Sequence, residues 1–288
     1  MSRRQLLNLL LLIVLLALGL LAWLRPGLEP PPAEQLTSLA SLDIKHITLH
    51  SKRATIHFER QGEGWMITDP PPMPADSLQV QRLAELTEAR VQRSYPAAEL
   101  EPAKLGLSDS SPRIELNDQA FLIGDTDPLS HLRYLQQGDH IYLIDDSLAN
   151  FLDAGRTQFA SRKLLPEGAR VTLLQLPDLI LHQTPDGRWQ AEPNAPAASA
   201  DDWNQLAQYW EHAQAIWVGK LKEQAEWPQQ ISIGLKDGTN LQYLLRSDSD
   251  DLILGRKDWG LEYHLGSAAR DQLLKPPAHD EPEATDQP

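Results

Sequence analysis

Two stretches of the chain repeat one order of residues: GEGWMITDPPPMPADSL at residues 62–78 and DGRWQAEPNAPAASADDW at residues 186–203. Each passes from a glycine turn to a tryptophan, then through a proline-rich stretch to Ala-Asp and an apolar helix start. Trp65 and Trp189 are 124 positions apart, and the aspartates that close the two stretches are separated by almost the same number. This spacing indicates a unit of about 110–125 residues that occurs twice.

The residues before each tryptophan alternate between apolar and polar, which predicts a β-hairpin. In the first copy, IKHITLH and ATIHFE form the two strands, with Leu49 opposite Ile56 and Ile47 opposite Phe58. This register leaves the four-residue turn SKRA between them. The second copy offers RVTLLQL and LILHQT in the same order. A hairpin is therefore predicted at the start of each copy.

Each hairpin is followed by a predicted helix and then by further strands. Asp76 and Asp201 have the residue type that caps helix N-termini, so we expect helices over residues 77–92 and 202–218. Strand-like segments follow in both copies, and FLIGDT in the first is matched with LILGRK in the second. The sequence predicts an α+β fold: two tandem copies of an antiparallel hairpin–helix–strands unit, preceded by one transmembrane helix.

The predicted domain organisation has six parts. They are a cytoplasmic N-terminus (1–5), a transmembrane anchor (6–24), a Pro-rich spacer (25–42), a first α+β repeat (43–166), a second α+β repeat (167–276) and a disordered acidic tail (277–288).

The N-terminal segment predicts the location of the protein. Residues 6–24 are apolar apart from Asn8 and would extend about 28 Å as a helix, enough to cross a hydrocarbon core. Arg3 and Arg4 precede the segment, which predicts a cytoplasmic N-terminus and a periplasmic body on the bacterial inner membrane. A cleaved signal peptide is the alternative, with Ala17-Leu18-Gly19 as the best cleavage match. Because the apolar run is longer than a signal-peptide core, we favour an uncleaved signal-anchor.

Composition excludes several classes of function. The 40 Asp and Glu residues outnumber the 26 Lys and Arg residues and give a formal net charge of −14, which disfavours a nucleic-acid partner. The sequence has no cysteine, so disulfides, thiolate metal sites and a cysteine nucleophile are excluded. It also lacks a phosphate-binding loop, a G-x-S-x-G elbow and an H-E-x-x-H zinc motif. We therefore predict no catalytic, cofactor or metal site.

Two groups of residues resemble metal sites but can be explained without a metal. The acidic run SDSDD at 247–251 has Ile253 and Trp259 where a calcium-binding EF-hand loop needs glycine and glutamate. His46 and His50 would lie about 13 Å apart along a strand, too far to share an ion. In the predicted hairpin His46 faces Glu59, and His57 faces Thr48. Surface turns and surface hydrogen bonds are therefore the simpler interpretations.

The chain resembles a bacterial family catalogued as domain of unknown function 4340. The resemblance rests on Gly-x-x-Trp after a hairpin, then Ala-Asp and a helix, LGLSDSSPRIEL, an Ile-Gly strand end and a closing SRKLLP. It covers residues 43–166 well and the second copy more loosely, where EWPQQISI replaces the Gly-Leu element. Members are typically membrane-anchored, and many lie beside ABC-transporter operons of the gliding-motility type. The resemblance supplies no catalytic residues.

The one candidate contact surface is a tryptophan stripe. Trp203, Trp210 and Trp217 recur every seven residues, with Leu206 and Ala213 between them, so one helix would carry all five on one side. The stripe can pack against its own sheet or bind a partner. We expect Trp210 to be buried and at least one flanking indole to be partly exposed near the junction of the copies.

Two functions are consistent with the sequence. The first is a non-enzymatic, membrane-anchored extracytoplasmic accessory protein that contacts envelope or ABC-transporter components. The alternative is an envelope glycan-binding protein or hydrolase that uses acidic residues between the copies, such as Asp125 and Asp127. A hydrolase would need two carboxylates about 5–10 Å apart across a cleft.

Overall fold

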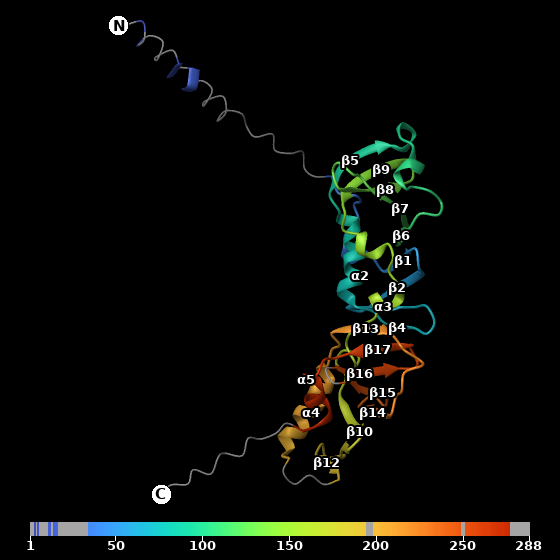
Figure 1. Cartoon of the computed structure of the whole chain (residues 1–288), viewed down its shortest axis with the longest axis vertical. Helices are drawn as coiled ribbons and strands as arrows, with labels where there is room; N and C mark the ends of the chain where they lie inside the picture. The colour runs from blue at the N-terminus through green and yellow to red at the C-terminus, as the bar shows by residue number, and fades with distance from the viewer. Residues whose placement is uncertain are drawn as a thin grey trace.

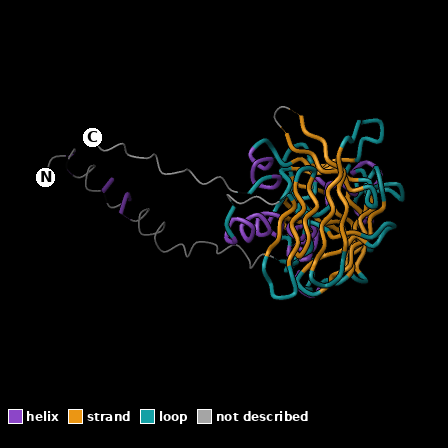
Figure 2. Tube along the Cα trace, turned by 90° about the horizontal axis from the view of Figure 1, so that it is seen from below, coloured by secondary structure: helices purple, strands orange, loops and turns teal. Residues whose placement is uncertain are grey.

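The computed structural model describes residues 34–193, 198–248 and 251–276, together with seven positions among the first 16 residues. The chain forms two β-sheet units stacked along the long axis (Figure 1). An end-on view shows strands filling most of the body, with helical turns at its margin (Figure 2).

The first unit is built on a nine-stranded antiparallel sheet with the order β4-β3-β2-β1-β6-β7-β8-β9-β5. Its strands are β1 (His46–His50), β2 (Thr55–Gln61), β3 (Gly64–Ile67), β4 (Met73–Pro74), β5 (Val91–Pro96), β6 (Arg113–Leu116), β7 (Gln119–Thr126), β8 (Leu132–Gln137) and β9 (His140–Asp145). The predicted hairpin register is confirmed, because Leu49 pairs with Ile56 and Ile47 with Phe58.

The second unit is built on an eight-stranded antiparallel sheet with the order β12-β11-β10-β14-β15-β16-β17-β13. Its strands are β10 (Val171–Leu176), β11 (Leu179–Gln183), β12 (Trp189–Glu192), β13 (Trp217–Lys220), β14 (Gln229–Leu235), β15 (Asn240–Asp248), β16 (Asp251–Arg256) and β17 (Leu261–His264).

The two sheets have the same connectivity. In each, three hairpin-linked strands lead to a helix, the next strand crosses to the far edge, and a four-stranded meander fills the middle. Strand β4 is the one addition in the first sheet. Such identical strand order is what a duplicated unit would give, and it places Trp65 on β3 and Trp189 on the equivalent strand β12.

The helices are short. The α-helices are α2 (Ser77–Ala84), α3 (Arg156–Phe159), α4 (Ala200–His212) and α5 (Ala268–Leu274), and the 3₁₀ turns are η1 (Ser41–Asp43), η2 (Glu85–Glu88), η3 (Ala97–Glu99), η4 (Pro102–Leu105) and η5 (Ala149–Phe151). The predicted cap Asp76 is confirmed, since its carboxylate accepts from the amides of Leu78 and Gln79. The cap of α4 is Ser199, in a capping box with Asp202, and not Asp201.

The α+β prediction is wrong, because the described chain is mostly β with two large antiparallel sheets. Both helices were predicted too long: α2 ends at Ala84 and α4 at His212, and the residues that follow lead into edge strands β5 and β13. Strand β8 was not predicted at all. Within the described residues, no helix is long and apolar enough to cross a membrane. The predicted anchor, residues 6–24, lies mostly outside the described residues.

Long-range backbone pairing explains both early helix ends. Behind α2, the carbonyl of Ala89 accepts a hydrogen bond from the amide of Leu36 at 2.9 Å. Behind α4, Ala213 is extended, and its carbonyl accepts from the amide of Leu164 at 3.1 Å. A local helical pattern cannot anticipate partners that lie about 50 residues away in the sequence. Such pairing satisfies backbone groups that would otherwise bond within the helix.

The match between FLIGDT and LILGRK is also wrong, because FLIGDT lies on β7 and LILGRK begins on β16, the equivalent of β8. The two glycines nonetheless share a role. A Cβ on Gly124 would lie 2.5 Å from the carbonyl oxygen of Leu105, and one on Gly255 would lie 2.9 Å from the side chain of Leu221. Each glycine admits the segment that crosses the sheet after the edge strand.

One hydrophobic core runs through both units. It includes Phe58 and Phe159 of the first unit, Trp210 and Tyr243 of the second, and Leu164 between them. The two phenylalanine rings meet edge to face with centroids 4.9 Å apart. Because buried side chains form a single cluster, the units are packed against each other and are not simply tethered.

Candidate functional site

A groove of about 600 Å³ lies where the two units meet. Trp65 and Leu78 contribute from the first unit, Leu241 and Trp259 from the second, and residues 161–167 run between them. Figure 1 shows β4 and α3 beside β13 at this junction. The groove therefore exists only because both units are present.

The connecting segment positions the two walls by pairing with each unit in turn. Ala160 forms an isolated antiparallel bridge with Ala75, directly after β4, and Lys163 forms another with Gln214, before β13. The amide of Ser161 donates to the carbonyl of Pro74 at 2.9 Å. The backbone of the connection thus ties an edge of one sheet to an edge of the other, which fixes the geometry of the groove.

The wall from the second unit centres on a buried arginine. Arg256 binds both carboxylate oxygens of Asp258, at 2.9 and 2.6 Å, and its guanidinium carbon lies 3.7 Å from the centre of the Trp259 ring. It also donates to the hydroxyl of Tyr243 at 3.2 Å, and that hydroxyl donates to the carbonyl of Leu164. Burial lowers the pKa of Arg256, but Asp258 and Tyr243 outweigh it, so the pKa is raised and the charge is fixed.

The wall from the first unit combines an aromatic base with an exposed apolar rim. Trp65 is 3% exposed, and the guanidinium of Arg60 lies 4.5 Å above its ring. Leu78, in the first turn of α2, is 59% exposed. Arg162 lies 3.4 Å from the carboxylate of Asp76, the cap of the same helix. The first-unit wall is therefore apolar at its base and rim, with an ion pair between.

The described lining of the groove combines apolar and aromatic side chains with charged ones. Among the described residues that line it there is no histidine, and its carboxylates include the helix cap Asp76 and Glu167, which pairs with Lys163 at 3.1 Å. A nucleophile with an adjacent base would be needed for covalent catalysis. Apolar walls with mostly paired charges beside them suit a noncovalent contact.

The three tryptophans of the predicted stripe do not share a helix. Trp203 and Trp210 lie on α4 and are buried, and the indole N–H of Trp210 donates to the carbonyl of Leu273 at 2.8 Å. Trp217 lies on β13, is 49% exposed and stacks on His264 with ring centroids 3.6 Å apart. The prediction of one helical face is therefore wrong. Trp210 is buried as expected, and the exposed indole lies at the junction.

Trp65 and Trp189 occupy equivalent strands but different environments. Trp65 lies in the groove wall, whereas Trp189 is half-buried and donates from its indole N–H to Asn204 of α4 at 2.8 Å. Trp65 is therefore buried, whereas the equivalent Trp189 is only half-buried.

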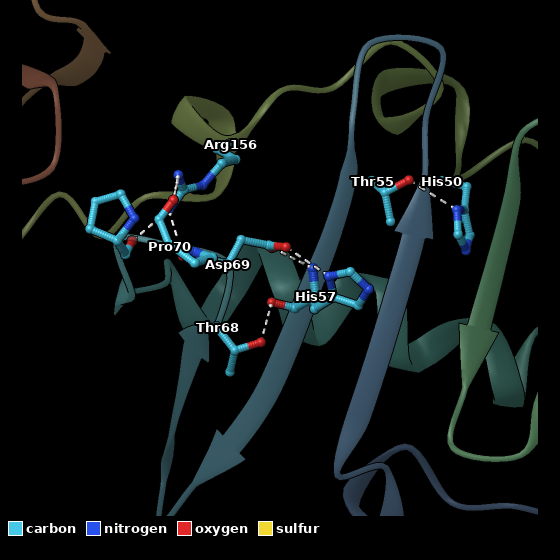
Figure 3. Close-up of polar contacts among 8 residues, drawn as sticks. His50, Thr55, His57, Thr68, Asp69, Pro70 and Arg156 are labelled. Carbon is cyan, nitrogen blue, oxygen red and sulfur yellow. Dashed lines mark hydrogen bonds and ion pairs between the residues drawn. The ribbon is translucent and has the colours of Figure 1, made fainter.

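The predicted histidine positions lie on the first hairpin and make polar contacts (Figure 3). His57 binds both carboxylate oxygens of Asp69, through its ring at 2.7 Å and its amide at 2.8 Å. Burial raises the pKa of Asp69, but these bonds outweigh it and the pKa is lowered. Arg156 donates to the carbonyls of Asp69, Pro70 and Pro71 at 2.7–3.1 Å. These hydrogen bonds hold the proline-rich segment that follows β3 in place.

The described residues form no recognisable metal-binding site. No group of three or more His, Asp or Glu side chains there could hold an ion. In the acidic run, Asp251 accepts from His264 at 2.6 Å and from the amide of Gly266 at 2.8 Å, while residues 249–250 lie outside the described part.

Asp125 and Asp127 do not lie between the copies. Asp125 is an exposed residue of β7, and Asp127 follows this strand in the turn to β8, where it accepts from the amide of Ser130 at 2.9 Å and from its hydroxyl. Strand β7 is separated from β4, at the junction, by four strands of the sheet. Neither acid lines the groove.

The sequence alone did not predict the groove or the role of Arg256 in its wall. The only signal is the turn GRKDWG after the apolar strand, which places Asp258 two residues after Arg256 and an indole next to it. This spacing allows a bidentate pair with an aromatic cover, but it does not reveal that the pair faces another unit.

The fold and groove define a class of protein: two antiparallel β-units of one connectivity, joined around a groove. The chain belongs to the family described as domain of unknown function DUF4340, whose match covers residues 65–225. The match starts at the groove tryptophan and extends past β13, so it spans the junction. No curated protein matches the chain, and no solved structure matches it.

Proposed function

We propose that this protein is a non-enzymatic accessory protein, anchored in the bacterial inner membrane, whose groove binds an envelope or ABC-transporter component. The body lies in the periplasm and the N-terminus in the cytoplasm. Support for the location comes from the sequence: residues 6–24 are apolar, Arg3 and Arg4 precede them, and a proline-rich spacer follows.

The observation that carries the proposed function is the junction groove. Its walls are apolar and aromatic, its charged side chains other than Glu63 form ion pairs, and Leu78 exposes an aliphatic side chain at the rim. Protein contact sites combine aromatic residues and arginine at the centre with a polar rim. Residues 160–166 hold both walls in place, so the surface is preformed and little ordering is needed when a partner binds.

The hydrolase alternative loses the acids on which it was based. Asp125 and Asp127 belong to the β7 end of the first unit and not to the groove. A glycosidase of the two-carboxylate type needs both acids on either side of one cleft. We therefore favour the accessory role over hydrolysis.

The test of the groove is crosslinking in native membranes. A photoreactive amino acid in place of Leu78, at the rim, should capture one discrete protein partner, identified by mass spectrometry. The same amino acid in place of Leu129, which is 91% exposed on the β7–β8 turn, is the matched control and should not capture it. Equal capture from both positions, or none from Leu78, contradicts the proposed contact site.

The location has its own test. Alkaline phosphatase fused after Leu24 should be active, and a cytoplasmic fluorescent reporter fused at the same position should be dark. The reverse pattern contradicts the topology without bearing on the groove. Recovery of a soluble chain that lacks residues 1–22 would support the cleaved-signal alternative instead.

A further inference from the structure

A second cavity, also of about 600 Å³, lies on the first sheet away from the groove. It is bounded by strand β5, by the β7–β8 turn and by the segment that crosses the sheet after β5. Leu105 of that segment forms an aliphatic wall, and Leu129 of the turn is exposed at the rim. None of its lining residues belongs to the junction groove, so it is independent of the proposed function.

The sheet register brings polar side chains together on the floor of this cavity. Arg93 on β5 pairs with Leu143 on β9, and Leu143 pairs with Tyr134 on β8. Residues in one cross-strand row lie on the same face of a sheet, so the guanidinium and the phenol flank Leu143. Tyr95, two residues further along β5, lies on the same face.

The turn supplies a fixed anion beside these groups. Hydrogen bonds from the hydroxyl and amide of Ser130 lower the pKa of Asp127. Burial and then the charge of Asp127 raise the pKa of Tyr134, and Tyr95 adds to this increase. At neutral pH the cavity therefore holds a carboxylate that accepts, a guanidinium that donates and phenols that do both.

We propose that this cavity binds a saccharide. A sugar ring presents hydroxyls that both donate and accept, and a face of C–H groups that packs on apolar walls. Arg93, Asp127 and the phenol of Tyr134 match the first property, and the leucines match the second. Pockets of this size that orient small ligands combine apolar walls with a few placed polar groups.

Other ligand classes fit less well. A phosphate group would be repelled by Asp127, which stays ionised. An extended peptide is also disfavoured as a strand added to β5. Arg90 precedes the strand, Arg93 lies on it and Pro96 ends it, and its register shifts between Val91 and Arg93. Charged residues, prolines and bulges of this kind block edge pairing. Asp127 is the only carboxylate among the described lining residues, so we infer binding without two-carboxylate hydrolysis.

The test measures binding of defined sugars to the purified full-length chain. Oligomers of N-acetylglucosamine, glucose and mannose, each at up to about 10 mM, are followed by saturation-transfer NMR and calorimetry. At least one should bind. Asp127→Asn and Arg93→Gln should each weaken that binding about tenfold or more. Asp125→Asn, an exposed acid outside the cavity, is the matched control and should leave it unchanged.

Two results would overturn the saccharide site. One is that the unchanged chain binds none of the three series. The other is that binding persists undiminished in Arg93→Gln, whose exposed side chain can be altered without disturbing the core. Because the groove is tested by crosslinking at Leu78, failure of either proposal is distinguishable from failure of the other.

Discussion

Replacing Tyr243 by phenylalanine tests how the two units are held together. The side chain of Tyr243 is 1% exposed, and its hydroxyl donates to the connecting segment while also accepting from Arg256. Tyr243→Phe keeps the ring and its packing against Trp210, so it opens no cavity. The change therefore isolates one hydroxyl at the junction.

The expected loss in the free energy of unfolding follows from the groups that lose a hydrogen-bond partner. Without the hydroxyl, the carbonyl of Leu164 loses its side-chain donor and Arg256 loses one acceptor, while Asp258 still holds the guanidinium. Leaving a buried polar group unsatisfied costs about 1–3 kcal/mol, and a neutral hydrogen bond contributes about 1 kcal/mol net. We expect the free energy of unfolding to fall by about 2 kcal/mol.

Urea unfolding of the purified chain, followed by tryptophan fluorescence, measures this change. Tyr263→Phe is the matched control: its ring lies 6.4 Å from that of Tyr243, and within the described chain its hydroxyl makes no hydrogen bond to residues 160–166. The control should lose less than half as much stability. Equal losses, or no loss in Tyr243→Phe, would refute the role of this hydroxyl.

Three further predictions concern packing and charge. Gly124→Ala should cost about 1–3 kcal/mol by thermal melting, because its Cβ would meet the carbonyl of Leu105, and no loss would contradict that close approach. Asp146→Asn should cost about 2–3 kcal/mol, since it removes the negative charge beside the buried Arg133 and replaces one of the two oxygens that accept from it at 2.6 Å by an NH2 group. Burial raises the pKa of Asp146 but Arg133 outweighs it and lowers the pKa, so this stability should fade as pH falls below about 4, and Asp146→Asn should flatten that acid limb. Burial raises the pKa of Tyr263, so the unfolding free energy should decline as pH rises above about 10, less steeply in Tyr263→Phe.

The register of the first hairpin could be predicted residue by residue because it depends only on the alternation within its two neighbouring strands. Alternation assigns the faces of both strands, and a one-residue slip would move Ile47 and Phe58 from the core to solvent. The Asp76 cap was predictable for the same reason, since its acceptors are the amides of its own helix.

The strand content could not be predicted because it depends on distant partners. Residues 213–218 have a helical pattern, yet Ala215 donates to the carbonyl of Arg162 at 2.8 Å and Trp217 pairs with His264. Tertiary pairing overrides propensity there. The β8 strand, LRYLQQ, was missed because Arg133 interrupts its alternation. This arginine can be buried because it pairs with Asp146 and donates to the carbonyl of Gly124.

The candidate site was even harder to predict from the sequence than the strand content. The spacing of Trp65 and Trp189 indicates the repeat, but the place of Trp65 in the groove wall depends on the opposite unit. Trp217 was placed on a helix, and its exposure comes from an edge strand. A duplicated sequence indicates that two units exist without specifying which edges meet.

The central claim is that the connecting segment holds both units in one fixed geometry around the groove, and disulfide formation tests it most directly. The chain has no cysteine, so Lys163→Cys with Gln214→Cys introduces a single pair at an antiparallel bridge. Cα atoms in such a bridge lie about 4.5–5.5 Å apart, within the range of a disulfide. Lys163→Cys with Leu129→Cys is the control. We predict that the first pair oxidises within the folded monomer and the control pair does not. A first pair that stays reduced in air, or crosslinks only between molecules, would contradict the account.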